Sequence, residues 1–134
     1  MITNIVSSQL IFLIMLNPPD NQYTYPAVIK SVYDGDTCTA EISIGFSVQL
    51  NGIKLRLYGI NAPELRNETL ELGRASRDYL KELVLDKAVV LQTFKDAKGK
   101  YGRYLAKLWI VVGTEWICVN DALVSSGHAI YQEY

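Results

Sequence analysis

Two stretches of this sequence alternate strictly between apolar and polar residues, and this period of two constrains the fold more than any other feature. Because successive side chains of a strand point to opposite faces, the alternation predicts two half-buried strands of an antiparallel sheet. We interpret the dipeptides Asp34-Gly35 and Asn51-Gly52 as tight turns at the strand ends, where glycine reaches a positive φ. The apolar positions are Cys38, Ala40, Ile42 and Ile44 in the first stretch and Ile53, Leu55 and Leu57 in the second.

After these stretches the apolar spacing changes to three and four. This spacing holds over residues 68–84 and predicts an amphipathic helix. Residues 88–94, 104–112 and 116–119 return to strand composition, with Gly113-Thr114 as a turn before the last of them. We expect Asn120 or Asp121 to cap a short final helix through Ser126, and Gly127 to end it in the left-handed conformation.

The order of these elements predicts the fold class. Three to four strands, a helix, two more strands and a closing helix indicate a small α+β domain built on a curled antiparallel sheet. Among small β-barrels, the five-stranded Greek-key OB-fold with about two to three helices agrees best with this order. A single domain of 134 residues can build a stable hydrophobic core without disulfide bonds. We therefore expect Cys38 and Cys118 to be two buried thiols.

The N-terminal residues stand apart from this pattern. Residues 1–29 contain no Lys or Arg, and residues 10–16 form an apolar run. The run is shorter than the roughly 20 residues that cross a bilayer, so we expect no stable membrane association. We assign residues 1–24 to an N-terminal tail. Four interpretations of this tail are open: a mis-assigned start with translation from Met15, a disordered segment, an atypical signal segment, or packed structure. Residues 25–134 form the expected domain, located in the cytoplasm or, if residues 1–16 act as a signal, exported.

Charge and histidine content limit the chemistry. The chain has 13 basic and 14 acidic residues and one histidine, His128, which we interpret as structural. One histidine excludes a histidine pair, so hydrolysis would depend on carboxylates, arginines and a hard cation. Residues 87–107 carry six basic side chains against Asp96 alone. Such a basic block is either a solvated face or the footprint of an anionic ligand.

Three clusters carry residues suited to that chemistry. They are Asp34-Gly35-Asp36-Thr37, the stretch 55–64 and the stretch 98–103. Taken alone, the first cluster is an ordinary turn, and the second holds a surface arginine and a solvated loop acid. Together they hold what phosphodiester cleavage without histidine needs. A cation and guanidinium groups neutralise the phosphate, and a carboxylate orients or deprotonates water.

With one further motif, these clusters resemble the ordered motifs of the staphylococcal nuclease (thermonuclease) family. The motifs are residues 32–37, 56–64, 100–103 and 120–124 with Gly127, and the resemblance covers residues 27–130. It implies an OB-fold barrel with helices for residues 25–134. It also implies a Ca²⁺-dependent endonuclease that cuts DNA and RNA, with single strands favoured, and leaves 3′-phosphate ends. We expect a monomer.

The resemblance also implies roles for individual residues. Asp36 matches a metal-binding carboxylate, and Ala62 stands where the family offers a backbone carbonyl to calcium. Arg56 matches the arginine that holds the scissile phosphate. Arg103 matches the second arginine, which stabilises the transition state, and Glu64 matches the glutamate that acts as general base or orients water.

Asn61 departs from the family pattern, which has a second metal-binding aspartate at this position. An amide oxygen still coordinates Ca²⁺, but affinity follows ligand charge, so we expect weaker metal binding and reduced turnover, or lost catalysis. Lys100 resembles a lysine near the terminal phosphate, and Tyr131 a nucleotide-stacking tyrosine. The alternatives are an inactive OB-fold module that binds single-stranded nucleic acid or a protein segment, and a structural domain without a nucleic-acid role.

Overall fold

The computed structural model describes residues 23–133, so the expectations for residues 1–22 lie outside the described residues. The first strand begins at Thr24, one residue before the expected domain boundary. None of the helices in residues 23–133 is long and apolar enough to span a membrane. The strands are β1 (Thr24–Asp34), β2 (Thr37–Gly45), β3 (Val48–Leu57), β4 (Ile60–Asn61), β5 (Ala88–Lys98), β6 (Tyr104–Val112), β7 (Glu115–Cys118) and β8 (Ile130–Tyr131). The helices are η1 (Asn67–Thr69), α2 (Leu70–Val84) and α3 (Val119–Ser125).

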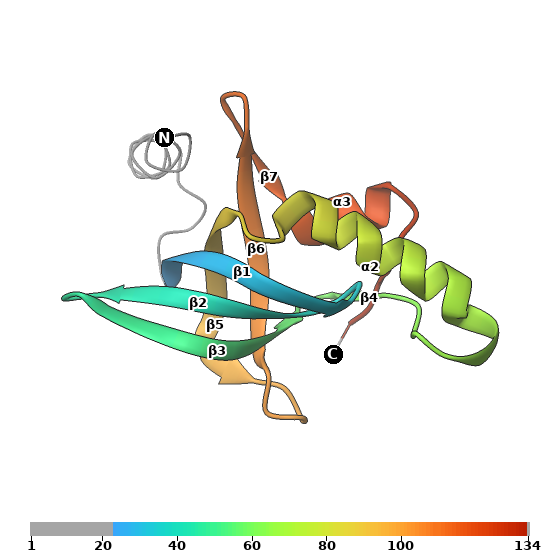
Figure 1. Cartoon of the computed structure of the whole chain (residues 1–134), viewed down its shortest axis with the longest axis horizontal. Coiled ribbons are helices and arrows are strands. Elements are labelled where there is room, and N and C mark those ends of the chain that lie inside the picture. The colour runs from blue at the N-terminus through green and yellow to red at the C-terminus, as the bar shows by residue number, and fades with distance from the viewer. Residues whose placement is uncertain (1–22, 134) are drawn as a thin grey trace.

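Six strands form one sheet in the order β3-β2-β1-β5-β6-β7, with antiparallel neighbours. One further pairing joins β3 to β6 in parallel, where Leu55, Arg56 and Leu57 face residues 104–106. Among β1, β2, β3, β6 and β5, each strand therefore pairs with two others of this set, and their pairings form a ring, while β6 also pairs with β7 outside it (Figure 1). A mostly β domain with two α-helices agrees with the prediction of about two to three helices, whereas the main sheet has six strands and not the predicted five.

The core lies between this ring and the helices α2 and α3, which add Leu80, Val84, Val119 and Leu123 to the buried side chains of the strands. Both cysteines are buried and free, as predicted, and burial raises the pKa of the Cys38 thiol to about 12. Helix α2 places Leu80 and Val84 on the core and packs its Ser76 against the β1–β2 turn. The large side chains that are completely enclosed include Ile29, Leu55, Leu57, Leu80, Leu91, Leu108 and Leu123.

Gly113-Thr114 forms a turn as predicted, but the other two predicted glycine turns differ from expectation. Asn51-Gly52 lies inside β3, where two residues oppose Glu41 of β2 and form a β-bulge with Gly52 at φ +66°. The β2–β3 turn lies at residues 45–47 instead, all three with positive φ. Gly35 does form a turn but has no positive φ. It is required because a Cβ there would lie 1.8 Å from the Ser76 Oγ.

The predicted cap of the last helix is also wrong. Helix α3 begins at Val119 after Cys118, and neither Asn120 nor Asp121 caps it. Asn120 is buried, and its amide accepts a hydrogen bond from the Leu108 N–H and donates to the carbonyls of Tyr58 and Ala106. The prediction failed because a polar side chain near a helix start can hydrogen-bond either to the first N–H groups of the helix or to the backbone of a distant strand. The local sequence does not show which of these two partners it takes. Gly127 has a positive φ of 83°, as predicted.

Candidate functional site

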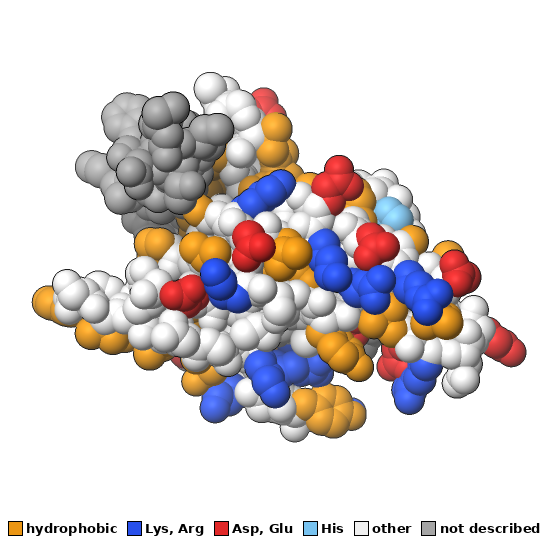
Figure 2. Space-filling view, in the orientation of Figure 1, with side chains coloured by type: hydrophobic (Ala, Val, Ile, Leu, Met, Phe, Trp, Pro, Cys, Tyr) orange, Lys and Arg blue, Asp and Glu red, His pale blue; other side chains and the backbone are white. Residues whose placement is uncertain are grey.

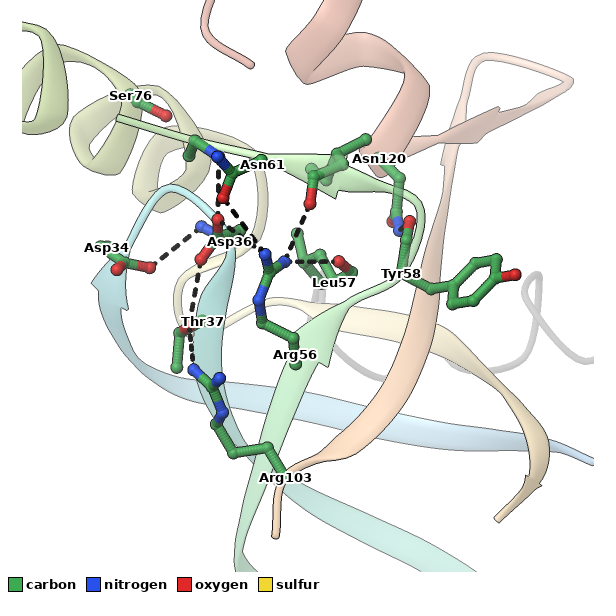
Figure 3. Close-up of polar contacts among 12 residues, drawn as sticks. Asp34, Asp36, Thr37, Arg56, Leu57, Tyr58, Asn61, Ser76, Arg103 and Asn120 are labelled. Atoms are coloured by element: carbon green, nitrogen blue, oxygen red, sulfur yellow. Dashed lines mark hydrogen bonds and ion pairs between the residues drawn. The ribbon is translucent and has the colours of Figure 1, made fainter. Parts of the chain in front are cut away.

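Asp36 is the centre of a polar cluster at the β1–β2 turn. Its Oδ2 accepts a hydrogen bond from the Ala62 N–H at 2.8 Å and lies 3.3 Å from Nη2 of Arg56. Its Oδ1 accepts a hydrogen bond from the Thr37 hydroxyl at 3.1 Å (Figure 3). The carboxylate is buried, and both of its oxygens have partners, so it is held in one orientation.

Arg56 comes from β3, opposite Thr37 of β2, on the face that does not carry Leu55 and Leu57. The interpretation as a surface arginine is wrong, because only 13% of its side chain is exposed. Its Nη1 donates to the carbonyls of Leu57 at 2.7 Å and Ile60 at 3.0 Å, and its Nη2 donates to Asn61 Oδ1 at 3.4 Å (Figure 3). Buried ion pairs persist when hydrogen bonds satisfy the remaining donors, and here both Nη atoms donate to protein oxygens.

Arg103 reaches the same cluster from the segment just before β6. Its Nη1 donates to the Thr37 hydroxyl at 3.1 Å, so Thr37 connects Arg103 to Asp36 (Figure 3). The Arg103 guanidinium also lies over the Tyr101 ring, 5.3 Å from its centroid, and Lys100 Nζ lies 5.1 Å from the same centroid. Sequence reasoning did not single out Thr37 as a bridge. Its only signal was its place at the end of the Asp-Gly-Asp-Thr motif.

Glu64 is not brought into this cluster. Its carboxylate is 62% exposed and accepts a hydrogen bond from Arg66 Nε at 2.6 Å. No hydrogen bond or ion pair within residues 23–133 joins it to Arg56 or Arg103. The backbone at Glu64 is nevertheless fixed, because its carbonyl accepts from the Thr69 hydroxyl and packs on Gly73, where a Cβ would lie 2.6 Å away.

Asp34 adds a second carboxylate beside Asp36. Its Oδ1 accepts a hydrogen bond from the Asp36 N–H at 3.1 Å. Burial, followed by the negative charge of Asp36, raises the pKa of Asp34 to about 6. The folded protein therefore holds a proton on Asp34 up to a higher pH than the unfolded chain does.

The C-terminal strand places Tyr131 beside the site. Strand β8 pairs with β4 in the register Ile60 to Tyr131 and Asn61 to Ile130. The Tyr131 hydroxyl donates to Asp121 Oδ1 at 3.0 Å, and this bond raises the pKa of Tyr131. The His128 ring packs against the Tyr79 ring at a centroid distance of 4.6 Å.

A calcium ion takes six to eight oxygen ligands, and the donors here are oxygens of the right type. Asp36 and Asn61 supply the side-chain oxygens at the predicted position, and each of these oxygens already has a hydrogen-bond or ion-pair partner within the protein. No group of three His, Cys, Asp or Glu side chains in residues 23–133 is placed to hold a metal ion. The residues fit a hard cation by chemistry but supply little negative charge for it.

Comparison with known sequences places this site in a family. Residues 54–134, more than half of the chain, match the family described as staphylococcal nuclease homologue, and the chain belongs to this family. The matched range contains Arg56, Asn61, Glu64 and Arg103, while Asp36 precedes it. An uncharacterized protein of Methanocaldococcus jannaschii is 29% identical in an alignment of 132 positions that includes 81% of this chain. The chain spans 59% of the length of that relative.

Proposed function

We propose that this protein is a Ca²⁺-dependent endonuclease that hydrolyses phosphodiester bonds of DNA and RNA and leaves 3′-phosphate ends. One observation carries the proposal. Two arginines from separate segments, Arg56 and Arg103, converge on the same buried carboxylate, Asp36, one directly and one through Thr37. A nuclease needs such fixed positive charge because its transition state gathers negative charge on the phosphate oxygens.

The two arginines have different parts in this proposal. Arg103 donates one hydrogen bond within the described residues, so its other N–H groups are available for a forked contact with phosphate. Arg56 donates from both Nη atoms to protein oxygens. It therefore contributes a fixed charge next to the phosphate and holds the segment around Asn61 in place.

Asp36, Asn61 and the Ala62 carbonyl are the groups that would hold calcium. When bound, the ion supplies positive charge that polarises the phosphate and favours ionisation of water. Because Asn61 is neutral, we expect a weaker calcium site than one with two carboxylates.

Glu64 is the proposed group that orients or deprotonates the attacking water. Its present partner is Arg66, and both side chains are mostly exposed. Exposed ion pairs are worth about 0–1 kcal/mol, so the Glu64 carboxylate exchanges this partner for water at little cost.

The ring of strand pairings supports a closed five-stranded Greek-key barrel of the OB-fold type, with residues 25–134 as the nuclease domain. Lys100 and Tyr131 complete the proposed substrate contacts. The substrate class is DNA and RNA, with single strands favoured, and the active form is the monomer.

Cleavage of denatured DNA with several millimolar CaCl₂, with and without chelator, tests the proposal. We expect cleavage that the chelator abolishes and that Arg103→Ala slows by about a hundredfold or more, the effect of losing one charge-stabilising donor. Arg74→Ala, which removes an exposed guanidinium on α2, is the matched control and should cleave at the normal rate. Cleavage by Arg103→Ala at the rate of the control would contradict the assignment.

A second candidate function is a module that binds single-stranded nucleic acid without cutting it. The neutral Asn61 and the pairing of Glu64 with Arg66 favour it. Salt-sensitive binding of denatured DNA without chelator-sensitive cleavage would support this function over the endonuclease.

A further inference from the structure

A cavity of about 300 Å³ lies at the end of the ring that contains the β2–β3 hairpin. This volume is at the lower end of the range for small-ligand pockets. All five strands of the ring contribute to the lining, which is mostly apolar. The lining residues are Tyr25, Ile42, Ile44, Leu50, Ile53, Leu55, Leu91, Thr93, Asp96 and Tyr104.

The only carboxylate in this lining is held in a strained backbone. Strand β5 bulges between Thr93 and Lys98, and both Lys95 and Asp96 have φ of +54°. This conformation is uncommon for residues other than glycine, and strain of this kind is often found at binding sites. The bulge turns Asp96 back so that its Oδ1 accepts from the Thr93 hydroxyl at 2.7 Å and the Tyr25 hydroxyl at 3.0 Å.

These bonds leave one oxygen of Asp96 nearly unused. Oδ2 has a single long contact, 3.3 Å from the Tyr25 hydroxyl. A carboxylate oxygen has two lone pairs, so Oδ2 can accept a further bond from a ligand N–H. The site thus combines two tyrosine rings, apolar walls and one hydrogen-bond acceptor.

Basic side chains lie next to the same cavity. Lys98 Nζ is 4.9 Å from the centroid of Tyr104, which lines the cavity. Figure 2 shows apolar side chains along the hairpin end of the molecule and basic side chains gathered below them. An occupant with an apolar, planar body and an attached anionic group matches this combination of surfaces.

We propose that this cavity binds one unstacked nucleobase that carries an amino group, adenine, cytosine or guanine, from a single-stranded nucleic acid. Aromatic side chains stack on the flat face of any base. The free oxygen of Asp96 selects among bases, because an amino group donates to it. In thymine and uracil the one ring N–H lies between two carbonyl oxygens, which a carboxylate repels.

The position of β6 links the cavity to the proposed cleavage site, and in this respect the inference rests on the proposed function. Tyr104 begins β6 and directly follows Arg103, and the two side chains make their contacts on opposite sides of the ring. Arg103 contacts Thr37 outside the ring, whereas Tyr104 lines the cavity inside it. A strand whose phosphate lies at Arg103 can therefore pass over the ring edge and place a neighbouring base in the cavity.

Binding of fluorescein-labelled dC6 and dT6, measured by anisotropy in chelator so that cleavage does not interfere, tests the proposal. We expect dC6 to bind more tightly than dT6. Leu50→Trp fills the cavity and should weaken dC6 binding by about tenfold, the scale of one lost base contact. Val48→Trp is the matched control, since Val48 lies two residues away on β3, is similarly exposed and does not line the cavity.

Asp96→Asn tests the selectivity with little risk to the fold, because asparagine tolerates the left-handed conformation. It should remove the preference for dC6 over dT6. Cytidine alone should shift the ring NMR signals of Tyr25 and Tyr104 but not those of the exposed Tyr33. Equal binding of dC6 and dT6, equal effects of Leu50→Trp and Val48→Trp, or no tyrosine shifts with cytidine would overturn the proposal. If the protein prefers dC6 over dT6 in an Asp96-dependent manner but does not cleave DNA, the proposed base-binding cavity stands and only the proposed endonuclease activity is refuted.

Discussion

The two ends of strand β2 are built on opposite principles. At its start, Asp36 and Thr37 are bonded to residues of three other segments, and Gly35 is pressed against Ser76 of α2. At its end, the turn at residues 45–47 extends into solvent, and Phe46 is fully exposed. The first end is packed and polar, and the second is open and apolar.

This difference teaches which end tolerates change. A buried charge network positions groups accurately, but removal of one member leaves another charge without a partner. An open apolar end loses little when one side chain changes and can admit a ligand. We therefore expect substitutions at the start of β2 to cost more stability than substitutions at its end.

The largest effect is expected for Arg56→Ala. It leaves the Asp36 carboxylate buried beside Asp34 without its cation, which should lower the free energy of unfolding by about 3–5 kcal/mol. Urea denaturation followed by circular dichroism measures this loss. The double variant Asp36→Asn/Arg56→Ala should recover part of it, and a loss below about 1 kcal/mol for the single variant would show that the pair is not a buried unit.

Gly35→Ala and Gly45→Ala compare the two ends of β2 directly. The first adds a Cβ that clashes with Ser76 and Ala62, and forces α2 to move, which should cost about 2–3 kcal/mol. The second adds a Cβ with nothing within 4 Å, but at a φ of +87°, which should cost about 1–2 kcal/mol. Thermal denaturation of the two variants side by side ranks these costs. The reverse order would contradict the packing described at Gly35.

Asp34→Asn should change how stability depends on pH. Because the folded pKa of Asp34 is raised to about 6, the folded state binds more protons than the unfolded state between about pH 4 and pH 6. The contribution of Asp34 to stability therefore falls as pH rises through this range and stays low above it. Asn removes this fall, so the variant should gain stability relative to the parent at pH 7 but not at pH 4. If the difference in the free energy of unfolding between the variant and the parent were the same at pH 4 and pH 7, the raised pKa of Asp34 would be refuted.

The smallest effect is expected at the exposed pair of Glu64 and Arg66. Arg66→Ala should change the free energy of unfolding by less than about 0.5 kcal/mol, because exposed ion pairs contribute little. It should not slow cleavage, whereas Glu64→Gln should. Full activity of Glu64→Gln across the pH range would remove Glu64 from the proposed mechanism.

Much of the fold was predictable because it depends on local pattern. The alternation in β2 and β3 and the three-and-four spacing of α2 identified the elements, and Cys38, Ala40, Ile42, Leu55, Leu57 and Leu80 are buried as expected. Ile44 and Leu72, which the same patterns place on the apolar faces, are exposed because they lie near the open end of the hairpin and the first turn of the helix. The same reasoning misplaced the β2–β3 turn, since an Asn-Gly pair serves a bulge as well as a turn. Register, and not composition, decides between them.

The candidate site was predictable only in part. The motifs identified Asp36, Arg56 and Arg103, which the fold does bring together. They did not indicate that Arg56 is buried, that Thr37 bridges two charges, or that Arg66 binds Glu64. These facts depend on side-chain directions and on contacts between segments far apart in the chain, which no local window contains.

Asn120 has a consequence for how the chain acquires its structure during synthesis. Its amide satisfies one N–H and one carbonyl of β6 and the carbonyl of Tyr58. A nascent chain that ends before residue 120 contains every strand of the ring but leaves these three backbone groups without that partner. Buried backbone groups that lose a hydrogen bond are costly, so the ring gains this part of its stability only after the last helix has left the ribosome.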